Sequence, residues 1–192
     1  MVLSKPDRNP RESYTSMQDP KTGLGLVQIY TGESKGKTTA ALGLALRARG
    51  QGFRVHVLQF LKGASNCGEH KFVREFHAFE IEQPVGEGSH FRHEDKRHVQ
   101  AQRTLERARE ILPSGDYDIV ILDEAVGAVA KGYIDEAEFV DLIENRPAGT
   151  EVVLTGRGAT PALIEIADYV TELKKVKHPM DRGIRARRGI EF

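Results

Sequence analysis

The sequence predicts an α/β fold in which a mostly parallel sheet is covered by helices on both faces. Three observations lead to this prediction. Short apolar runs of strand length alternate with segments whose apolar residues recur at helical spacing. The strand-like runs are apolar almost throughout, as in strands buried on both faces. A glycine-containing turn joins the first such run to a helix-like segment. Strands connected through helices make right-handed crossovers, and these produce a parallel sheet.

The expected strands are short and rich in β-branched residues. Four segments match this description well, namely residues 25–30, 54–60, 118–122 and Glu151–Thr155. Two weaker candidates are AFEIE around Phe79 and YVTEL around Val170.

Helices are expected between the strands, over residues 37–49, 94–112, 135–144 and 161–167. In the second of them, Ala101, Leu105, Ala108 and Leu112 recur at steps of four and three. This spacing places them in one apolar stripe that should face the core.

The bulk composition favours one domain without a large charged surface. The 192 residues are enough for one core, and 28 basic residues balance 28 acidic ones. This balance argues against a broad surface for nucleic acid or membrane. Apolar runs are only strand-sized, and no charged-then-apolar leader opens the chain, so we expect a cytoplasmic protein. The lone Cys67 is interpreted as an incidental thiol, since it cannot form an intramolecular disulfide.

The first 22 residues differ from the rest of the chain. They are polar and contain Pro6, Pro10 and Pro20, which interrupt any helical pattern. We interpret residues 1–22 as an N-terminal arm and residues 23–192 as a single domain.

The turn in YTGESKGKTTAALG, residues 30–43, is similar to a phosphate-binding loop. The standard pattern is a glycine, four residues and Gly-Lys-Ser/Thr. Here Gly36, Lys37 and Thr38 fit, but the earlier glycine is Gly32, so the loop is one residue shorter. Backbone N–H groups and the following helix N-terminus would attract an anion. Lys37 would contact phosphate oxygens and Thr38 would join a Mg²⁺ shell. The alternative is a glycine turn that only caps a helix.

A second signal for nucleotide binding lies in YDIVILDEA. An apolar strand ends there in Asp123 and Glu124, at the sheet edge where ligands of parallel sheets bind. Carboxylates at this position are the usual partners of a Mg²⁺–triphosphate, although an acidic helix cap gives the same pattern. Together the two signals predict nucleotide binding in a P-loop NTPase-like (RecA-like) fold. They do not specify a reaction.

Five segments, in order along the chain, resemble the P-loop type of ATP:cob(I)alamin (corrinoid) adenosyltransferases. They are TGESKGKTTAALGLALRARGQG, QFLKG followed by GE, VILDE, LTGRG, and the C-terminal ADYVTELKKVKHPMDRGIRARRGIEF. The short loop, LTGRG and the C-terminal pattern are the specific ones. The resemblance extends over residues 25–192.

The resemblance implies a reaction that explains the short loop. Members of this family hold ATP in the reverse sense to ordinary P-loop enzymes. Co(I) of a corrinoid (cobalamin, cobinamide or cobyrinic acid diamide) attacks C5′ of ATP, and triphosphate leaves. Mg²⁺ or Mn²⁺ is the implied cofactor, with Thr38, Asp123 and Glu124 as its ligands. The implied nucleotide-binding residues are Gly32, Glu33, Ser34, Lys35, Gly36, Lys37, Thr38, Thr39, Arg47 and Arg157.

Two of these residues also have ordinary interpretations. Arg157 follows a buried strand toward the ligand edge, and either contacts phosphate or supports a turn. Arg47 matches a family arginine, but could equally be an exposed helix residue. Ser34 stands where the family commonly has glycine.

On the corrinoid side, the family places an apolar side chain below four-coordinate cobalt, on a loop that reads Gly-Phe-x-Trp. The corresponding segment here is GSHF, residues 88–91, and the chain contains no Trp. Phe91 would take the Trp position, which leaves Ser89 at the other aromatic position. Lys37, Thr38 and Phe91 are therefore the expected catalytic residues. A homodimer and an electron donor such as a reduced flavoprotein are also implied, with neither nucleic acid nor membrane as partner.

Other interpretations remain open from the sequence. On the same fold, the chain could be a divergent ATPase or nucleoside kinase, or a nucleotide-dependent corrinoid-binding module. The histidines His90, His93 and His98 could suggest a metal site. His90 and His93 are three residues apart and would share a face of a helix, but nothing supplies a clear third ligand. His178 and Asp181 match the family's C-terminal pattern without a role that their chemistry explains.

Overall fold

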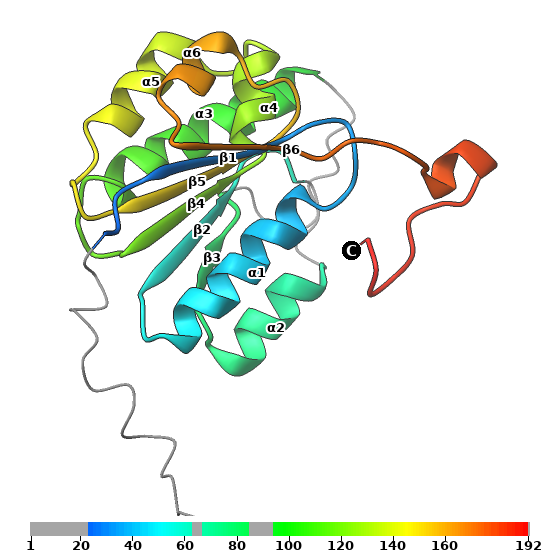
Figure 1. The fold of residues 1–192 in the computed structure, drawn as a ribbon, viewed down its shortest axis with the longest axis horizontal. Coiled ribbons are helices and arrows are strands. Elements are labelled where there is room, and N and C mark those ends of the chain that lie inside the picture. The colour runs from blue at the N-terminus through cyan, green and yellow to red at the C-terminus, as the bar shows by residue number, and fades with distance from the viewer. Residues whose placement is uncertain (1–22, 63–66, 85–93, 192) are drawn as a thin grey trace, which may run out of the picture.

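Six strands form one parallel sheet in the computed structural model, which describes residues 23–62, 67–84 and 94–191 (Figure 1). The strand order is β3-β2-β4-β5-β1-β6. The strands are β1 (Val27–Thr31), β2 (Val55–Gln59), β3 (Glu80–Glu82), β4 (Ile119–Asp123), β5 (Glu151–Thr155) and β6 (Tyr169–Glu172). The prediction of an α/β fold with a parallel sheet is confirmed, and both weaker strand candidates are present.

The helices alternate with these strands along the chain. They are α1 (Lys37–Gly50), α2 (Gly68–Phe76), α3 (Glu94–Ile111), α4 (Ala125–Ala130), α5 (Glu136–Glu144), α6 (Pro161–Glu165) and the 3₁₀ helix η2 (Pro179–Arg182). All four predicted helices are confirmed, with ends that differ by at most two residues. The sequence analysis missed α2, α4 and η2. The first is mostly exposed and polar, and α4 is uniformly apolar, so it carries no helical period.

Helices cover both faces of the sheet and build two core layers (Figure 1). Helix α1 packs Ala41, Ala45 and Ala48 against one face, together with Ile119 and Ile121 of β4. On the other face, the predicted apolar stripe of α3 is buried in the same core layer as Val120 and Leu122 of β4, which alternate along the strand with Ile119 and Ile121. The central strands β2, β4 and β5 are buried along their whole length, as expected. β1 instead alternates between buried and half-buried residues: Val27 and Ile29 belong to the core, whereas Gln28 and Tyr30 on the other face are half-buried.

The strand order determines where a ligand can bind. From β1 the chain passes through α1 to β2, which lies three positions away in the sheet, whereas β6 lies on the other side of β1. The connections to β2 and to β6 therefore run to opposite sides of β1. Loops that follow the carboxyl ends of β1, β2, β4 and β5 therefore meet at one edge, the usual ligand site of open α/β sheets. Both predicted nucleotide motifs, after β1 and after β4, lie at this edge.

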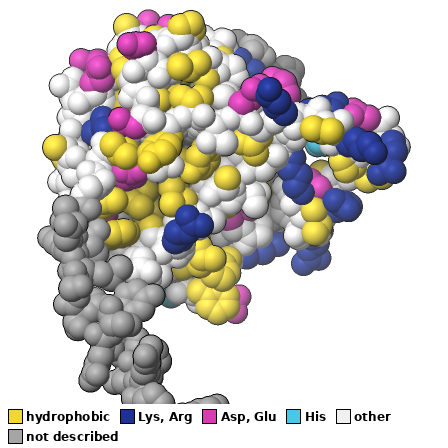
Figure 2. Space-filling view, in the orientation of Figure 1, with side chains coloured by type: hydrophobic (Ala, Val, Ile, Leu, Met, Phe, Trp, Pro, Cys, Tyr) yellow, Lys and Arg dark blue, Asp and Glu magenta, His cyan; other side chains and the backbone are white. Residues whose placement is uncertain are grey.

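After β6 the chain leaves the body of the domain and forms a C-terminal tail, residues 173–191 (Figure 1). The tail passes through η2 and returns to the start of α1, where Lys35 Nζ contacts Glu191 Oε1 at 3.1 Å. Figure 2 shows basic side chains on this tail; they belong to Lys174, Lys175, Lys177, Arg182, Arg185, Arg187 and Arg188, all exposed. Among the described helices, none combines the length and apolar character that crossing a membrane requires.

Candidate active site

The phosphate-loop segment, residues 32–36, connects β1 to α1 and requires its two glycines. Gly32 and Gly36 adopt φ values of 100° and 117°, which favour glycine. A Cβ on Gly32 would also come within 2.5 Å of the Leu173 carbonyl oxygen. The same oxygen accepts a hydrogen bond of 3.1 Å from Ser34 N. The loop is therefore packed against the chain that follows β6, which fixes its shape.

The Lys37 side chain lies inside this loop rather than in solvent. Only 6% of the residue is exposed, and Nζ donates hydrogen bonds to the carbonyl oxygens of Gly32 (2.7 Å) and Ser34 (2.8 Å). Burial lowers the pKa of Lys37, while the nearby Glu124 carboxylate opposes that effect. The ammonium is thus a fixed positive charge where the loop meets the first turn of α1.

Asp123, at the end of β4, anchors a network of polar contacts below the loop. Its Oδ1 accepts hydrogen bonds from the hydroxyls of Thr38 (2.9 Å) and Thr155 (2.6 Å). Its Oδ2 accepts one from Gln59 Nε2 (3.2 Å) and lies 3.0 Å from Lys62 Nζ. Since these groups come from α1 and from the ends of the three strands β2, β4 and β5, the network ties the phosphate-loop helix to the centre of the sheet.

Glu124 follows Asp123 and points toward the cavity that the loop borders. Its backbone is left-handed, with φ of 62°, and its N–H donates to Thr155 Oγ1 at 3.0 Å. Burial and the neighbouring Asp123 carboxylate raise the pKa of Glu124, whereas Lys62 and Lys37 lower it. Two adjacent carboxylates in a partly buried place favour a bound cation, which would relieve their repulsion.

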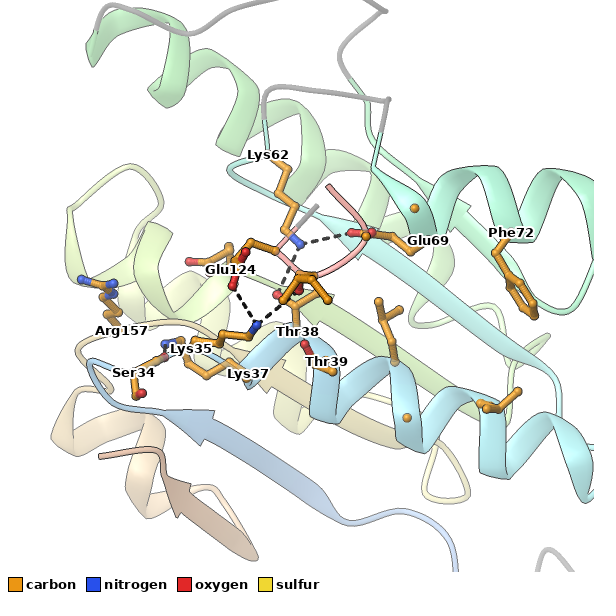
Figure 3. Close-up of a pocket in the computed structure, with 18 of the residues that line it drawn as sticks. Ser34, Lys35, Lys37, Thr38, Thr39, Lys62, Glu69, Phe72, Glu124 and Arg157 are labelled. Atoms are coloured by element: carbon orange, nitrogen blue, oxygen red, sulfur yellow. Dashed lines mark hydrogen bonds and ion pairs between the residues drawn. The ribbon is translucent and has the colours of Figure 1, made fainter. Parts of the chain in front are cut away.

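Lys62 and Glu69 complete the polar end of the cavity (Figure 3). Lys62 Nζ lies 3.3 Å from Thr38 Oγ1 and 3.5 Å from Glu69 Oε1, in addition to its contact with Asp123. Burial disfavours the charge on Lys62, but Asp123 and Glu69 outweigh burial and raise its pKa. The side chain is therefore a cation in the folded protein at neutral pH.

The cavity has a polar end and an apolar side, and its volume of about 700 Å³ is in the usual range for small-molecule sites. Ser34, Lys35, Gly36, Lys37 and Thr38 form the polar end with Lys62 and Glu124. The apolar side comes from α1, α2 and the segment before β3, through Leu42, Leu46, Phe72 and Phe79. The tail closes part of the opening with His178, Gly189, Ile190 and Glu191. Such a division suits a ligand with an anionic end and a large apolar body.

Most of the sequence-predicted nucleotide residues meet at this cavity. Ser34, Lys35, Gly36, Lys37, Thr38, Thr39, Glu124 and Arg157 line it. The carbonyl of Gly32 accepts a hydrogen bond from Lys37 Nζ, and Glu33 Oε2 accepts one of 2.9 Å from Arg157 Nη1, with which it forms an ion pair. Arg47 is exposed and is not among the lining residues. Phe91, like Ser89, His90 and His93, lies outside the described residues.

The oxygen donors of Thr38, Asp123 and Glu124 are those that Mg²⁺ and Mn²⁺ prefer. The structure offers a direct indication of fit, because a cation already bridges two of these donors. Lys62 Nζ contacts both Thr38 Oγ1 and Asp123 Oδ2. The residues present therefore fit a divalent ion at this position.

The sequence analysis assigned no role to Lys62, Glu69, Gln59 or Thr155, although all four lie in the segments QFLKG, GE and LTGRG. The sequence offered only a partial signal for Lys62: it follows the carboxyl end of a predicted strand, and the structure shows that this strand, β2, is the neighbour of β4 in the sheet. That neighbour relationship is a property of the strand order and cannot be read from the sequence alone.

Comparison with known proteins agrees with this geometry. The family model for ATP:corrinoid adenosyltransferase BtuR/CobO/CobP matches residues 23–192. The corrinoid adenosyltransferase of Pseudomonas aeruginosa is 39% identical over 170 residues, which cover 88% of this chain and 84% of the relative. The corrinoid adenosyltransferase of Escherichia coli K12 is 36% identical over 169 residues, covering 88% and 86%. Corrinoid adenosyltransferase CobA of Salmonella typhimurium is 35% identical over 170 residues, with the same two coverages.

Proposed function

Because the chain belongs to the ATP:corrinoid adenosyltransferase family, we propose that it binds ATP with the triphosphate at the polar end of the cavity. The enzyme transfers the adenosyl group of ATP to a corrinoid. In our proposal, C5′ of the ribose faces the apolar side of the cavity. The observation that carries this orientation is the position of Lys37 and Thr38 at one end and of Leu42, Leu46 and Phe72 along the other side.

The reaction needs a strong anchor for the leaving group. An electron pair of Co(I) forms the new bond to C5′, and the C5′–O bond breaks with its electrons on the triphosphate. Lys37 and Thr38 stabilise the charge that grows on the departing oxygens. The loop carbonyls that hold Lys37 keep its ammonium in place, so little reorganisation is required as charge develops.

Thr38, Asp123 and Glu124 are proposed to hold Mg²⁺ or Mn²⁺. When bound, the ion would neutralise part of the triphosphate charge. Asp123 orients the Thr38 hydroxyl through a 2.9 Å hydrogen bond, and the Thr155 hydroxyl fixes both Asp123 and the backbone N–H of Glu124. Arg157 is proposed to leave its exposed ion pair with Glu33 and to contact phosphate instead. The remaining loop residues, Lys35 and Thr39 among them, would complete the triphosphate contacts, and Arg47 stays a prediction.

The corrinoid is proposed to lie against the apolar side of the cavity, with Phe91 below the cobalt. Leu46 and Phe72 are 59% and 43% exposed, so their apolar surface is available to a large ring.

A homodimer is also proposed, since Val176, Met180, Ile184 and Ile190 of the tail are exposed. Sedimentation analysis measures that oligomeric state directly. A reduced flavoprotein as electron donor and a cytoplasmic location complete the proposal.

The Phe91→Ala variant tests the cobalt side. If the Phe91 ring keeps a lower ligand away from cobalt, its removal lets water or the base return, and Co(II) becomes harder to reduce. We expect a large loss of turnover with Co(II) substrate and a much smaller loss with chemically prereduced Co(I). ATP affinity should stay near normal. Electron paramagnetic resonance of bound Co(II) is the direct readout: a spectrum that Phe91→Ala leaves unchanged would rule out this role.

Product analysis with and without metal tests the proposal as a whole. Incubation with ATP, Mg²⁺ and a prereduced corrinoid should release intact tripolyphosphate and form the adenosylated corrinoid. Excess chelator should abolish most of the activity, because the protein alone cannot balance the triphosphate charge. Release of ADP would instead indicate phosphoryl transfer, and binding without any product would indicate a corrinoid carrier. Full activity in chelator would contradict the metal site.

A further inference from the structure

Lys62 occupies an unusual position for a lysine next to a nucleotide loop. It follows β2, and its ammonium reaches across the sheet edge to Asp123 Oδ2 at 3.0 Å and to Thr38 Oγ1 at 3.3 Å. Glu69 Oε1, at the start of α2, is 3.5 Å away. The side chain is 23% exposed and lines the cavity, so it is not sealed inside the core (Figure 3).

Asp123 would remain well supported without this lysine. Two hydroxyls and the Gln59 amide also donate to its carboxylate, and the residue is only 1% exposed. Gln59 is itself oriented by His70, whose Nε2 lies 2.7 Å from Gln59 Oε1. What Lys62 adds is positive charge, placed between the hydroxyl and the carboxylate that are proposed to bind the metal.

A divalent ion and the Lys62 ammonium cannot share these two oxygens. Mg²⁺ binds oxygen at about 2.0–2.1 Å, so an ion on Thr38 Oγ1 and the Asp123 carboxylate would lie within a few ångströms of Nζ. Two cations at that separation repel strongly when they are partly buried. The lysine must therefore move when the metal binds, and its flexible four-carbon side chain permits this movement.

We propose that Lys62 exchanges partners during ATP binding: the metal displaces its ammonium from Asp123 and Thr38, and the ammonium then binds the triphosphate. The inference rests on the proposed metal site and goes beyond it by assigning a binding role to a further residue. The triphosphate is the nearest anion that would enter the same cavity, where Lys62 and Lys37 are both lining residues. Lys62 would thus serve as a substitute cation before the metal arrives and as a triphosphate ligand afterwards.

The alternative role for Lys62 is a fixed structural ion pair. A structural lysine would stabilise the protein, and its loss would weaken the binding of both the metal and the triphosphate, or of neither. The partner exchange predicts opposite effects on two ligands. Without Lys62 the Asp123 carboxylate is no longer neutralised, so the metal alone should bind more tightly. The triphosphate loses one charge-assisted contact, so it should bind more weakly.

The experiment compares the full-length wild type with Lys62→Met, which keeps the length of the side chain and removes its charge. Mn²⁺ binding in the absence of nucleotide is followed by electron paramagnetic resonance of free Mn²⁺. Binding of Mg²⁺–tripolyphosphate is followed by calorimetry. We expect Mn²⁺ affinity to rise about threefold or more and tripolyphosphate affinity to fall about tenfold. Lys71→Met, which removes an exposed charge from the same helix as Glu69, should change neither affinity.

Two further measurements make each outcome decisive. Thermal melts establish that Lys62→Met is folded, and Lys62→Gln repeats both titrations if it is not. A folded variant with unchanged or weaker Mn²⁺ binding, or with unchanged tripolyphosphate binding, would overturn the partner exchange. Asp123→Asn separates this failure from failure of the metal site. If Asp123→Asn loses Mn²⁺ binding while Lys62→Met does not change it, the metal site stands and the role of Lys62 is wrong. If Asp123→Asn binds Mn²⁺ normally, Asp123 does not hold the metal, and the partner exchange is wrong as well.

Discussion

Replacing Lys37 by alanine is expected to slow adenosyl transfer about tenfold or more, because the triphosphate loses a charge-assisted contact of about 2–3 kcal/mol. The lysine also has a structural role: it is buried, and its Nζ donates hydrogen bonds to the carbonyls of Gly32 and Ser34 at 2.7 and 2.8 Å. The variant should therefore also loosen the loop, although the sheet and α1 remain.

Steady-state rates with prereduced corrinoid at varied ATP concentration measure this effect. Lys37→Arg separates the effect of charge from that of geometry, since it keeps the positive charge but does not fit the two carbonyls of the loop. Lys71→Met controls for the general loss of a positive charge. A folded Lys37→Ala protein that transfers adenosyl groups at a near-normal rate would refute the assignment of the loop.

Replacing Asp123 by asparagine is expected to reduce the metal-dependent rate on the order of a hundredfold, because the metal loses a carboxylate ligand. The variant keeps the shape of the side chain, and its oxygen can still accept from Thr38 and Thr155. Its amide nitrogen, however, would face the Gln59 amide and the Lys62 ammonium, which are both donors. We therefore expect lower thermal stability as well, on the order of 1–3 kcal/mol.

Glu124→Gln is the matched comparison for Asp123→Asn, since each removes one charge from the same pair. Asp123 is held by four protein groups, whereas Glu124 lines the cavity. Mn²⁺ titration of both variants identifies which carboxylate contributes more to the ion. If Asp123→Asn retains full turnover with Mg²⁺ and the same sensitivity to chelator, Asp123 has no part in metal binding.

Much of the site could be predicted because local signals coincide with the fold. Gly36-Lys37-Thr38 lies directly between a strand and a helix, and the Asp123 pair ends a buried strand, so both positions follow from strand polarity. Arg47 stays a prediction, because its helix position takes it away from the cavity. Leu42, Gly43 and Leu46 place one face of α1 on the cavity. Arg47, one residue beyond Leu46, is rotated about 100° away and lies exposed.

The sequence by itself determined the α/β class, the apolar stripe of α3 and the phosphate-loop position, because each depends on periodicity or on neighbours in the chain. Only the tertiary structure decided that Lys62 meets Asp123, and that the tail residues Gly189, Ile190 and Glu191 border the cavity. These contacts join segments separated by tens of residues. Their proximity depends on the order of strands in the sheet and on the path of the tail, which no local pattern encodes.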